Sequence, residues 1–473
     1  MDAQVTFLNG GARTAHAADR AAAPYDPLYD PLVKPPGQGQ NYAPTYWVAT
    51  AGEPPPDDGP IRGDVGADVV IVGSGFTGLS IALALARDFG IRATVLEANR
   101  AVWGCTSRNG GQGQNASGRL YRSQWIQRWG VDVARRLDAE IRDGFEYWKS
   151  LVAQIDCDAQ PGGHLYTAHR PKKLAFLQNE ARIMREVFGY DTRMLSREEL
   201  RERYADDREA AGALLEPDGI GVHPLKLAFG YLRQARALGV RVHPSSPVLG
   251  WDSDAGVYRL HTPGGTVRAR RVAFATGGYT AQGVNRLLDN RIMPILSNSM
   301  VTRPLSEAER REAGLHSTVF ITDTRILRFY YRLLPDGRMQ IGSRSAIHGA
   351  DAAQPRHLEL LRHGLARKFP ALRDVQVDYS WWGWVDVSHD MMPRVTQPDP
   401  GQRVYYALGY GGNGVSFSAQ AGRRLAQRIV GKDRVRWDLP VYDTPLPGHT
   451  FAPWRRLGQS LLYRWYYLRD EIF

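Results

Sequence analysis

Three glycines with a fixed spacing are the first residues in this chain whose arrangement indicates chemistry. Gly73, Gly75 and Gly78 form the pattern G-x-G-x-x-G, directly after the apolar run 68–72 and directly before a helix-forming run that ends at Gly90. In such a turn the first glycine permits the bend, the second admits a pyrophosphate at the helix N-terminus, and the third lets the helix pack on the strand. The spacing predicts an adenine dinucleotide site. The alternative is a tight turn without a ligand.

An acidic residue supports the same site. Glu97 directly follows the second apolar run, 93–96, so that strand, turn, helix and strand form one βαβ unit. A carboxylate at the end of the second strand can bind both hydroxyls of a ribose and repels a 2′-phosphate. The residues therefore favour NAD or FAD over NADP.

The segment 103–115, WGCTSRNGGQGQN, is too polar and too rich in glycine for a strand or a stable helix. It forms either a solvated loop or a surface of backbone N–H groups and amides for a large polar ligand. Two more strand-to-glycine junctions follow, VAFATGGYT at 272–280 and VYYALGYGGNGVSFS at 404–418. A second glycine-rich helix start is unnecessary for a nicotinamide enzyme. It suits a flavin, because the helix N-terminus stabilises the negative charge that appears on the ring upon reduction.

Taken together, DVVIVGSGFTGLSIALALA, LEANRAVWGCTSRNGGQ, ATGGYT and GYGGNGV resemble the FAD-dependent amino acid and amine oxidoreductases of the D-amino acid oxidase superfamily. The string WG-x-x-S-RNGGQ is most similar to the branch of γ-glutamylputrescine oxidoreductase and bacterial L-pipecolate oxidase. The resemblance covers about 42–431. It implies an α/β fold, in which a Rossmann-like FAD-binding domain of the glutathione-reductase type is interleaved with an α+β substrate domain built on an antiparallel sheet.

The resemblance implies FAD held without a covalent link, and it implies the residues that contact it. Asn413 departs from a histidine common in the glutamylputrescine branch, which places that exact substrate in doubt. Cys105 stands where the family often has alanine, so a small packed residue is expected there. The implied cofactor contacts are Gly73, Gly75, Phe76, Thr77, Gly78, Glu97, Ala98, Arg100, Ser107, Arg108, Asn109, Gly110, Gly111, Gln112, Val248, Thr276, Gly277, Gly411, Gly412, Asn413, Gly414 and Val415.

The activity that the resemblance implies is oxidation of an amino acid or amine at a C–N bond. Hydride passes to flavin N5, and the imine product hydrolyses. The electron acceptor is O2 or a quinone. No lysine lies in a flavin-facing motif, which weakens an oxidase assignment, whereas Arg108 is a candidate for the positive charge that an oxidase places near the flavin. The sequence assigns no catalytic base and no metal site, and His389 is interpreted as structural. The alternative from a different class is a non-catalytic dinucleotide-binding protein.

Substrate binding is expected in the segment ILRFYYRLLPDGRMQIGSRS. On a strand, Tyr330 and Arg332 face the same way, and Arg332 either grips a substrate carboxylate or forms a surface ion pair. Trp382, with Trp381 and Trp384, either walls an apolar pocket or packs in the core. The expected substrate-binding set is Tyr330, Arg332, Trp382 and Asn413.

The surrounding elements divide the chain. We expect a flexible N-terminal arm at 1–41, an FAD-binding domain at 42–120, 220–290 and 385–431, a substrate domain at 121–219 and 291–384, and a C-terminal extension at 432–473. The stretch 130–239 reads as mainly helical. The turn LPDG at 334–337 predicts a hairpin, and 355–369 predicts a helix.

Composition and charge limit the classes of partner and compartment that are expected for this chain. The chain has 473 residues, 43% of them hydrophobic, and a formal net charge of +11. The basic residues are scattered, so nucleic acid is not an expected partner. Two cysteines and the absence of a secretory signal favour a cytoplasmic protein. The arginine- and aromatic-rich tail, 452–473, suits either a peripheral membrane contact or docking on its own protein.

Overall fold

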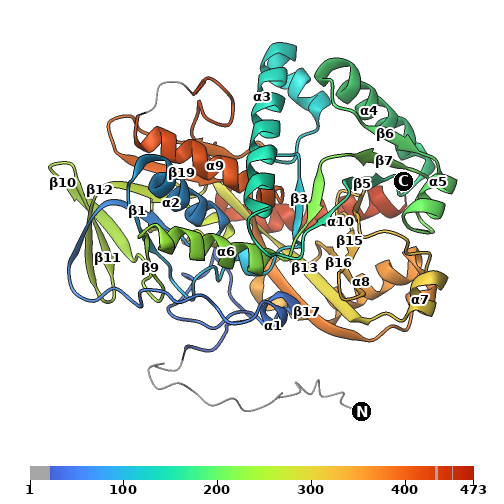
Figure 1. Ribbon diagram of the computed structural model, residues 1–473, viewed down its shortest axis with the longest axis horizontal. Coiled ribbons are helices and arrows are strands. Elements are labelled where there is room, and N and C mark those ends of the chain that lie inside the picture. The colour runs from blue at the N-terminus through green and yellow to red at the C-terminus, as the bar shows by residue number, and fades with distance from the viewer. Residues whose placement is uncertain (1–21, 432–434, 450, 473) are drawn as a thin grey trace.

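A computed structural model describes residues 22–431, 435–449 and 451–472. Within them the strands form two eight-stranded sheets and one three-stranded sheet. In Figure 1 the strands β1, β11 and β12 lie to the left, and β5, β7, β15 and β16 lie to the right. The expected mixed α/β architecture is confirmed.

The first sheet has a parallel centre. β1 pairs in parallel with β2 and β12, β2 pairs with β9, and β12 pairs with β19, whereas β10, β11 and β18 join in antiparallel fashion. The carboxyl ends of β1, β12 and β19 therefore meet at one edge. The strands are β1 (Val65–Val72), β2 (Thr94–Leu96), β9 (Arg241–His243), β10 (Gly250–Asp254), β11 (Val257–Thr262), β12 (Gly265–Phe274), β18 (Arg394–Thr396) and β19 (Val404–Leu408).

The predicted βαβ unit is confirmed at the start of this sheet. Helix α2 (Phe76–Phe89) connects β1 to β2, and it ends at Gly90, whose φ of 67° lies in the left-handed region. Helices α6 (Pro224–Ala237) and α9 (Gly414–Ile429) pack beside α2, and α9 follows β19 as predicted. Both α2 and α9 begin at the edge where the parallel strands end.

The second sheet is largely antiparallel, in the order β17-β13-β16-β15-β14-β5-β7-β6. The LPDG hairpin is confirmed between β15 and β16. The prediction that 130–239 is mainly helical is wrong in part, because this range also contains β5, β6 and β7. These strands are short and do not alternate between apolar and polar residues, so the sequence pattern does not reveal them. The strands are β5 (His164–Thr167), β6 (Arg193–Leu195), β7 (Ala213–Glu216), β13 (Ile292–Pro304), β14 (Phe320–Asp323), β15 (Tyr330–Leu333), β16 (Arg338–Ser343) and β17 (Val377–Ser388).

A small sheet and further helices complete the fold. The sheet joins β3 (Gln112–Gln114), β4 (Gln160–Pro161) and β8 (Gly219–Gly221). The long helix α3 is interrupted at Gly130, where φ is 78°. The remaining helices are α1 (Tyr46–Thr50), α3 (Arg122–Val152), α4 (Leu174–Phe188), α5 (Arg197–Arg203), α7 (Glu307–Glu312), α8 (Pro355–Lys368) and α10 (Arg455–Glu471).

The two large sheets draw on the ranges expected for two domains. The first takes its strands from 65–96, 241–274 and 394–408, and the second from 164–216 and 292–388. We propose that these sheets define the FAD-binding and substrate domains. Helix α3 is shared between them. It lies in the range expected for the substrate domain, yet it packs along α9 of the FAD-binding range, where Arg424 pairs with Glu140 at 2.7 Å.

The N-terminal arm is not flexible over its described part. Tyr29 is buried and its carbonyl accepts a hydrogen bond from Trp384 Nε1 at 3.0 Å. Asp30 pairs with Arg456 at 2.9 Å. The prediction of a flexible arm is therefore wrong for 22–41, since its aromatic residues pack on the body. The rest of the predicted arm, 1–21, lies outside the described residues.

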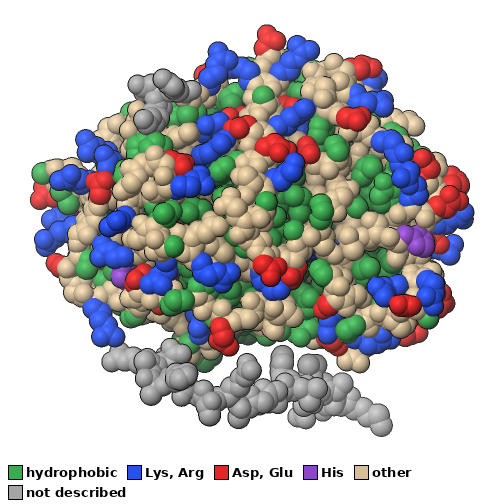
Figure 2. Space-filling view, in the orientation of Figure 1, with side chains coloured by type: hydrophobic (Ala, Val, Ile, Leu, Met, Phe, Trp, Pro, Cys, Tyr) green, Lys and Arg blue, Asp and Glu red, His purple; other side chains and the backbone are tan. Residues whose placement is uncertain are grey.

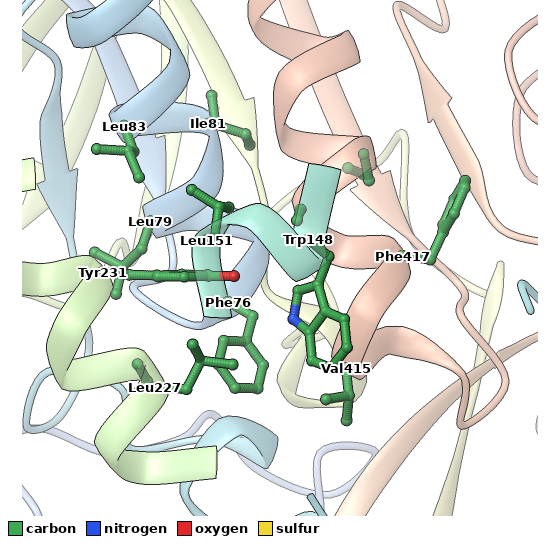
Figure 3. Close-up of a cluster of buried hydrophobic side chains, with 14 of the residues drawn as sticks. Phe76, Leu79, Ile81, Leu83, Trp148, Leu151, Leu227, Tyr231, Val415 and Phe417 are labelled. Carbon is green, nitrogen blue, oxygen red and sulfur yellow. The ribbon is translucent and has the colours of Figure 1, made fainter. Parts of the chain in front are cut away.

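An apolar core joins the helices that cover the first sheet. Figure 3 shows side chains of α2, α3, α6 and α9 converging, among them Phe76, Trp148, Tyr231 and Phe417. Each such large side chain contributes about 1.5–3 kcal/mol when fully buried. On the surface, basic and acidic side chains are interspersed over the face in Figure 2. This view agrees with the interpretation of the net charge as a general surface property.

The C-terminal helix α10 buries polar residues and exposes apolar ones. Its polar residues Gln459 and Asp470 are buried against the body, whereas Leu457, Leu461 and Trp465 are more than half exposed. These apolar residues are spaced four apart and share one face. Among the described residues no helix is long and apolar enough to span a membrane.

Close packing of α3 on α9 generates a stability prediction. A Cβ at Gly144 would lie 2.6 Å from the Gln420 Cβ, so Gly144→Ala should lower the free energy of unfolding by about 1–3 kcal/mol. The control is Gly458→Ala in α10, where no atom lies within 4 Å and alanine should add about 0.5–1 kcal/mol. Thermal unfolding of the two variants checks this. Equal shifts in both would contradict the packing.

Candidate functional site

One cavity follows the edge where β1, β12 and β19 end and continues to the second sheet. Its volume is about 820 Å³. Tyr330 and Arg344 of the second sheet share its wall with the turns of the first. The cavity wall contains these predicted cofactor residues: Gly73, Gly75, Phe76, Thr77, Glu97, Ala98, Arg108, Asn109, Gly110, Gln112, Val248, Thr276, Gly277, Gly411, Gly412, Asn413, Gly414 and Val415.

The three glycines of the first turn have separate roles. Gly73 has a φ of 104°, and a Cβ there would lie 2.7 Å from the Ala275 carbonyl oxygen. A Cβ at Gly78 would lie 1.8 Å from the Gly73 carbonyl oxygen, so Gly78 serves helix packing and is absent from the cavity wall. At Gly75 the nearest atom is Thr106 Oγ1 at 3.0 Å. Gly75 therefore leaves the helix N-terminus open to a ligand.

Glu97 is fixed beside this turn. Its Oε2 accepts hydrogen bonds from Ser74 N at 3.0 Å and from Ser74 Oγ at 2.7 Å. The carboxylate thus lies at the end of β2, where a ribose would need it. Arg100, in contrast, is not in the wall, because its guanidinium lies 5.5 Å from the centre of the Tyr42 ring.

The polar segment 103–115 forms one side of the cavity. Asn109 Oδ1 accepts from Gly111 N at 2.8 Å, which tightens the turn. Ser107 and Gly111 lie behind the wall: Ser107 Oγ donates to the Trp103 carbonyl at 2.8 Å, and a Cβ at Gly111 would meet the Val222 carbonyl oxygen at 2.1 Å. Neither contacts the cavity, so these two residues shape the segment from behind.

Two side chains of this segment face the cavity in different ways. Gln112 lines the wall, and its Nε2 is buried without a hydrogen-bond partner. Arg108 also lines the wall, but its guanidinium is stacked within 4.2 Å of the Trp103 ring centre and donates to the Trp103 carbonyl at 3.1 Å. Gln112 is free to donate to a ligand, whereas Arg108 is held by aromatic rings.

The N-terminus of α9 forms the next part of the wall. Asn413 Nδ2 donates to the Gly118 carbonyl at 2.5 Å, so its amide joins two turns. Asp386 lies nearby and was missed by sequence reasoning. Its Oδ2 accepts from Gly409 N at 2.6 Å, and burial raises the pKa of this carboxyl to about 6. No local motif marks Asp386, since β17 reads as an ordinary strand.

The end of the cavity nearest the second sheet contains Tyr330 and unexpected arginines. Tyr330 packs on Gly110, and its hydroxyl is within 2.8 Å of Ser299 Oγ. Arg119, Arg328 and Arg344 line the same region. Sequence reasoning missed all three arginines. Arg328 and Arg344 belong to the predicted substrate segment, so the segment was the available signal.

Two predicted substrate residues lie elsewhere. Arg332 is buried behind the cavity, where it donates to the Val222 carbonyl at 2.7 Å and to Gln160 Oε1 at 3.1 Å. It contacts neither a substrate position nor a surface carboxylate. Trp382 points away and donates to the Pro27 carbonyl at 3.2 Å. Of the two interpretations of the tryptophans, packing holds for Trp381 and Trp384, which are buried.

Neither Cys105 nor His389 supplies a reactive group to the cavity. Cys105 lines the cavity, and desolvation raises the pKa of its thiol to about 12. His389 stacks edge-on against His449 at 4.8 Å, outside the wall. Within the described ranges no group of three or more His, Cys, Asp or Glu side chains is arranged to hold a metal ion.

These residues fit FAD. The turn at Gly75 can hold a pyrophosphate, Glu97 a ribose, and the α9 N-terminus a flavin pyrimidine, and all of them belong to one continuous wall. The unpartnered Nε2 of Gln112 provides a donor for a polar ring edge.

Comparison with known proteins gives the same fold and cofactor. The family model for FAD dependent oxidoreductases (DAO) matches residues 68–428. The chain is 33% identical over 436 residues to gamma-glutamylputrescine oxidoreductase of Escherichia coli (strain K12), covering 90% of this chain and 98% of that protein. It is 24% identical to glycine oxidase of Bacillus licheniformis, covering 77% and 93%. The crystal structure of glycine oxidase from Geobacillus kaustophilus superposes with a TM-score of 0.67 at 21% identity, covering 81% and 99%.

The different roles of the glycines generate a prediction. Gly75→Val should fold but retain little flavin, because its side chain would enter the cavity beside the Thr106 hydroxyl, whereas no backbone atom lies in its way. Gly78→Val should fail to fold, because its side chain meets backbone. Flavin absorbance per chain and far-ultraviolet circular dichroism measure both properties. A full complement of flavin in folded Gly75→Val would contradict the placement of the pyrophosphate.

Proposed function

This chain belongs to the family of FAD-dependent oxidoreductases, and we propose that it oxidises the C–N bond of an amino acid or a related amine. The observation that carries this proposal is the continuity of one cavity from Gly75 to Tyr330 of the second sheet. A substrate seated against the second sheet would lie next to the cofactor. Family membership sets aside the alternative of a non-catalytic dinucleotide-binding protein.

When bound, FAD supplies the oxidising chemistry by accepting a hydride from the substrate carbon. The protein's contribution is to bind and orient. Tyr330 is held by Ser297 at 3.0 Å and Ser299 at 2.8 Å, and burial raises the pKa of its phenol. Tyr330 therefore stays neutral and positions substrate by hydrogen bonding. The imine product hydrolyses in water. No side chain is assigned as a catalytic base.

The names of the relatives support the substrate class without fixing the substrate. One relative is a gamma-glutamylputrescine oxidoreductase and another a glycine oxidase, so both amine and amino acid substrates occur among similar chains. In this protein the amide of Asn413 is occupied by the Gly118 carbonyl. We therefore propose amino acid or amine oxidation as the class, and we do not propose γ-glutamylputrescine itself.

The proposed electron acceptor is O2 or a quinone, and one observation supports each. Arg119 donates to the Gly411 carbonyl at 3.3 Å, which places positive charge beside the predicted flavin pyrimidine and supports O2. The exposed apolar face of α10 supports a second candidate, a peripheral membrane enzyme that reduces quinone. That face carries Trp454 and Trp465 beside the exposed Arg464, a combination suited to an anionic lipid surface.

Reduction of the bound flavin tests the main proposal. Under anaerobic conditions the purified protein should lose its flavin absorbance on addition of a suitable member of a panel of proline, pipecolate, sarcosine, glutamate and γ-glutamylputrescine. Admission of oxygen should restore the absorbance of an oxidase, whereas a dehydrogenase should need a quinone. A flavin that stays oxidised with every amine and amino acid would refute the proposal.

Vesicle binding tests the membrane candidate. The double variant Leu461→Asp, Trp465→Asp should bind vesicles of anionic phospholipid at least about tenfold more weakly, because each apolar side chain contributes roughly 1.5–3 kcal/mol on burial. Leu238→Asp, at an exposed position on α6's C-terminal end, is the matched control. Equal binding of the double variant and the control would contradict a membrane role for α10.

A further inference from the structure

Three arginines gather in the cavity wall without a carboxylate partner. Arg119, Arg328 and Arg344 all line it, and in the described part of the chain no carboxylate oxygen lies within 4.0 Å of their guanidinium nitrogens. Two buried arginines elsewhere in the fold are paired with carboxylates: Arg325 with Asp323 at 2.6 Å, and Arg122 with Asp138 at 2.7 Å. Arg119, Arg328 and Arg344, in contrast, present guanidinium groups without such a partner to one cavity.

Arg119 and Arg344 lie beside the turn 411–412, and Arg328 is near enough to both to lower their pKa values. Arg119 Nη1 donates to the Gly411 carbonyl at 3.3 Å. Arg344 Nη2 lies 3.1 Å from the position of a Cβ at Gly412. Arg328 lies 5.8 Å from the centre of the Tyr166 ring, and its Nε is buried without a hydrogen-bond partner.

No carboxylate pairs directly with these arginines, although Tyr166, Tyr121 and the more distant Asp323 raise the pKa of Arg328 against the effect of burial. Burial, together with the neighbouring Arg328, lowers the pKa of Arg344 to about 10, which still leaves it charged at neutral pH. Burial also lowers the pKa of Arg119, with further lowering by Arg344 and Arg328. Unpaired buried charge is costly, and guanidinium groups bind carboxylates and phosphates in bidentate geometry. An anion bound among the three would relieve this cost.

We infer that the substrate carries at least two carboxylates, or one dianionic group, in addition to its amine, and that Arg119, Arg328 and Arg344 hold these groups. This inference rests on the proposed function. A single carboxylate, with two oxygens, would leave at least one of the three guanidinium groups unpaired. Glu180 and Glu216 also line the cavity, but the three guanidinium groups disfavour a simple diamine at their end of it, so that end selects acidic amino compounds over cationic ones.

The C-terminal helix contributes to this end of the site. Arg344 lines both the cavity and a groove between α8 and α10, and Tyr463 of α10 lies in that groove. The Tyr463 hydroxyl is buried without a hydrogen-bond partner. Arg344 therefore lies where the cavity and the groove approach each other, and an acidic substrate that entered along the groove would pass it.

Binding of non-reactive acids to the holoprotein tests the inference independently of turnover. Perturbation of the flavin absorbance gives a Kd for glutarate, a dicarboxylate without an amine, and for butyrate, which has one carboxylate. Glutarate should bind at least about tenfold more tightly than butyrate. Arg328→Gln and Arg344→Gln should each weaken glutarate at least about tenfold and keep the flavin.

Arg201→Gln, at an exposed position on α5 that lines neither the cavity nor the groove, is the matched control and should leave the Kd for glutarate unchanged. Equal affinities for glutarate and butyrate, or unchanged glutarate binding in both variants, would overturn the inference. Loss of flavin from Arg328→Gln or Arg344→Gln would assign the arginines to the cofactor and would also overturn it. Arginine-dependent glutarate binding in a protein whose flavin no amine reduces would refute the proposed function while the anion site stands.

Discussion

The parallel pairing of β1 with β12 and of β12 with β19 is the constraint on which the site depends. It brings the ends of three strands that are distant in sequence to one edge of a sheet. Two helices, α2 and α9, begin at that edge, so two helix N-termini face one cavity. Because a dinucleotide is long and carries negative charge at both its pyrophosphate and its reduced ring, this arrangement suits FAD.

The part of the site that sequence could predict is the part made by local rules. The G-x-G-x-x-G turn, Glu97 and the start of α9 each depend on neighbours within a few residues, and the structure places them in one wall. Arg332 shows the limit of such rules. Strand alternation correctly gives it the same face as Tyr330. At Arg332, two residues further along the strand, Val222 and Gln160 pack against that face and separate it from the cavity.

Residues that depend on long-range contacts could not be predicted. Arg119 follows β3 and Arg344 follows β16, and only the folded chain brings both beside Gly411 and Gly412. The N-terminal arm is a similar case, because Tyr29 packs beneath Trp384, far along the chain. The burial of polar residues in α10 also needs the structure, since its buried face is recognised only from the body on which Gln459 and Asp470 lie.

We propose that one cavity holds FAD and an acidic amine substrate in contact with each other. A crystal structure of the holoprotein with glutarate would show this contact or its absence. We expect the pyrophosphate at Gly75, the flavin pyrimidine at Gly411 to Val415, and the glutarate carboxylates within hydrogen-bond distance of Arg328 and Arg344. Glutarate bound away from the arginines, or a flavin ring outside this cavity, would refute the proposed arrangement.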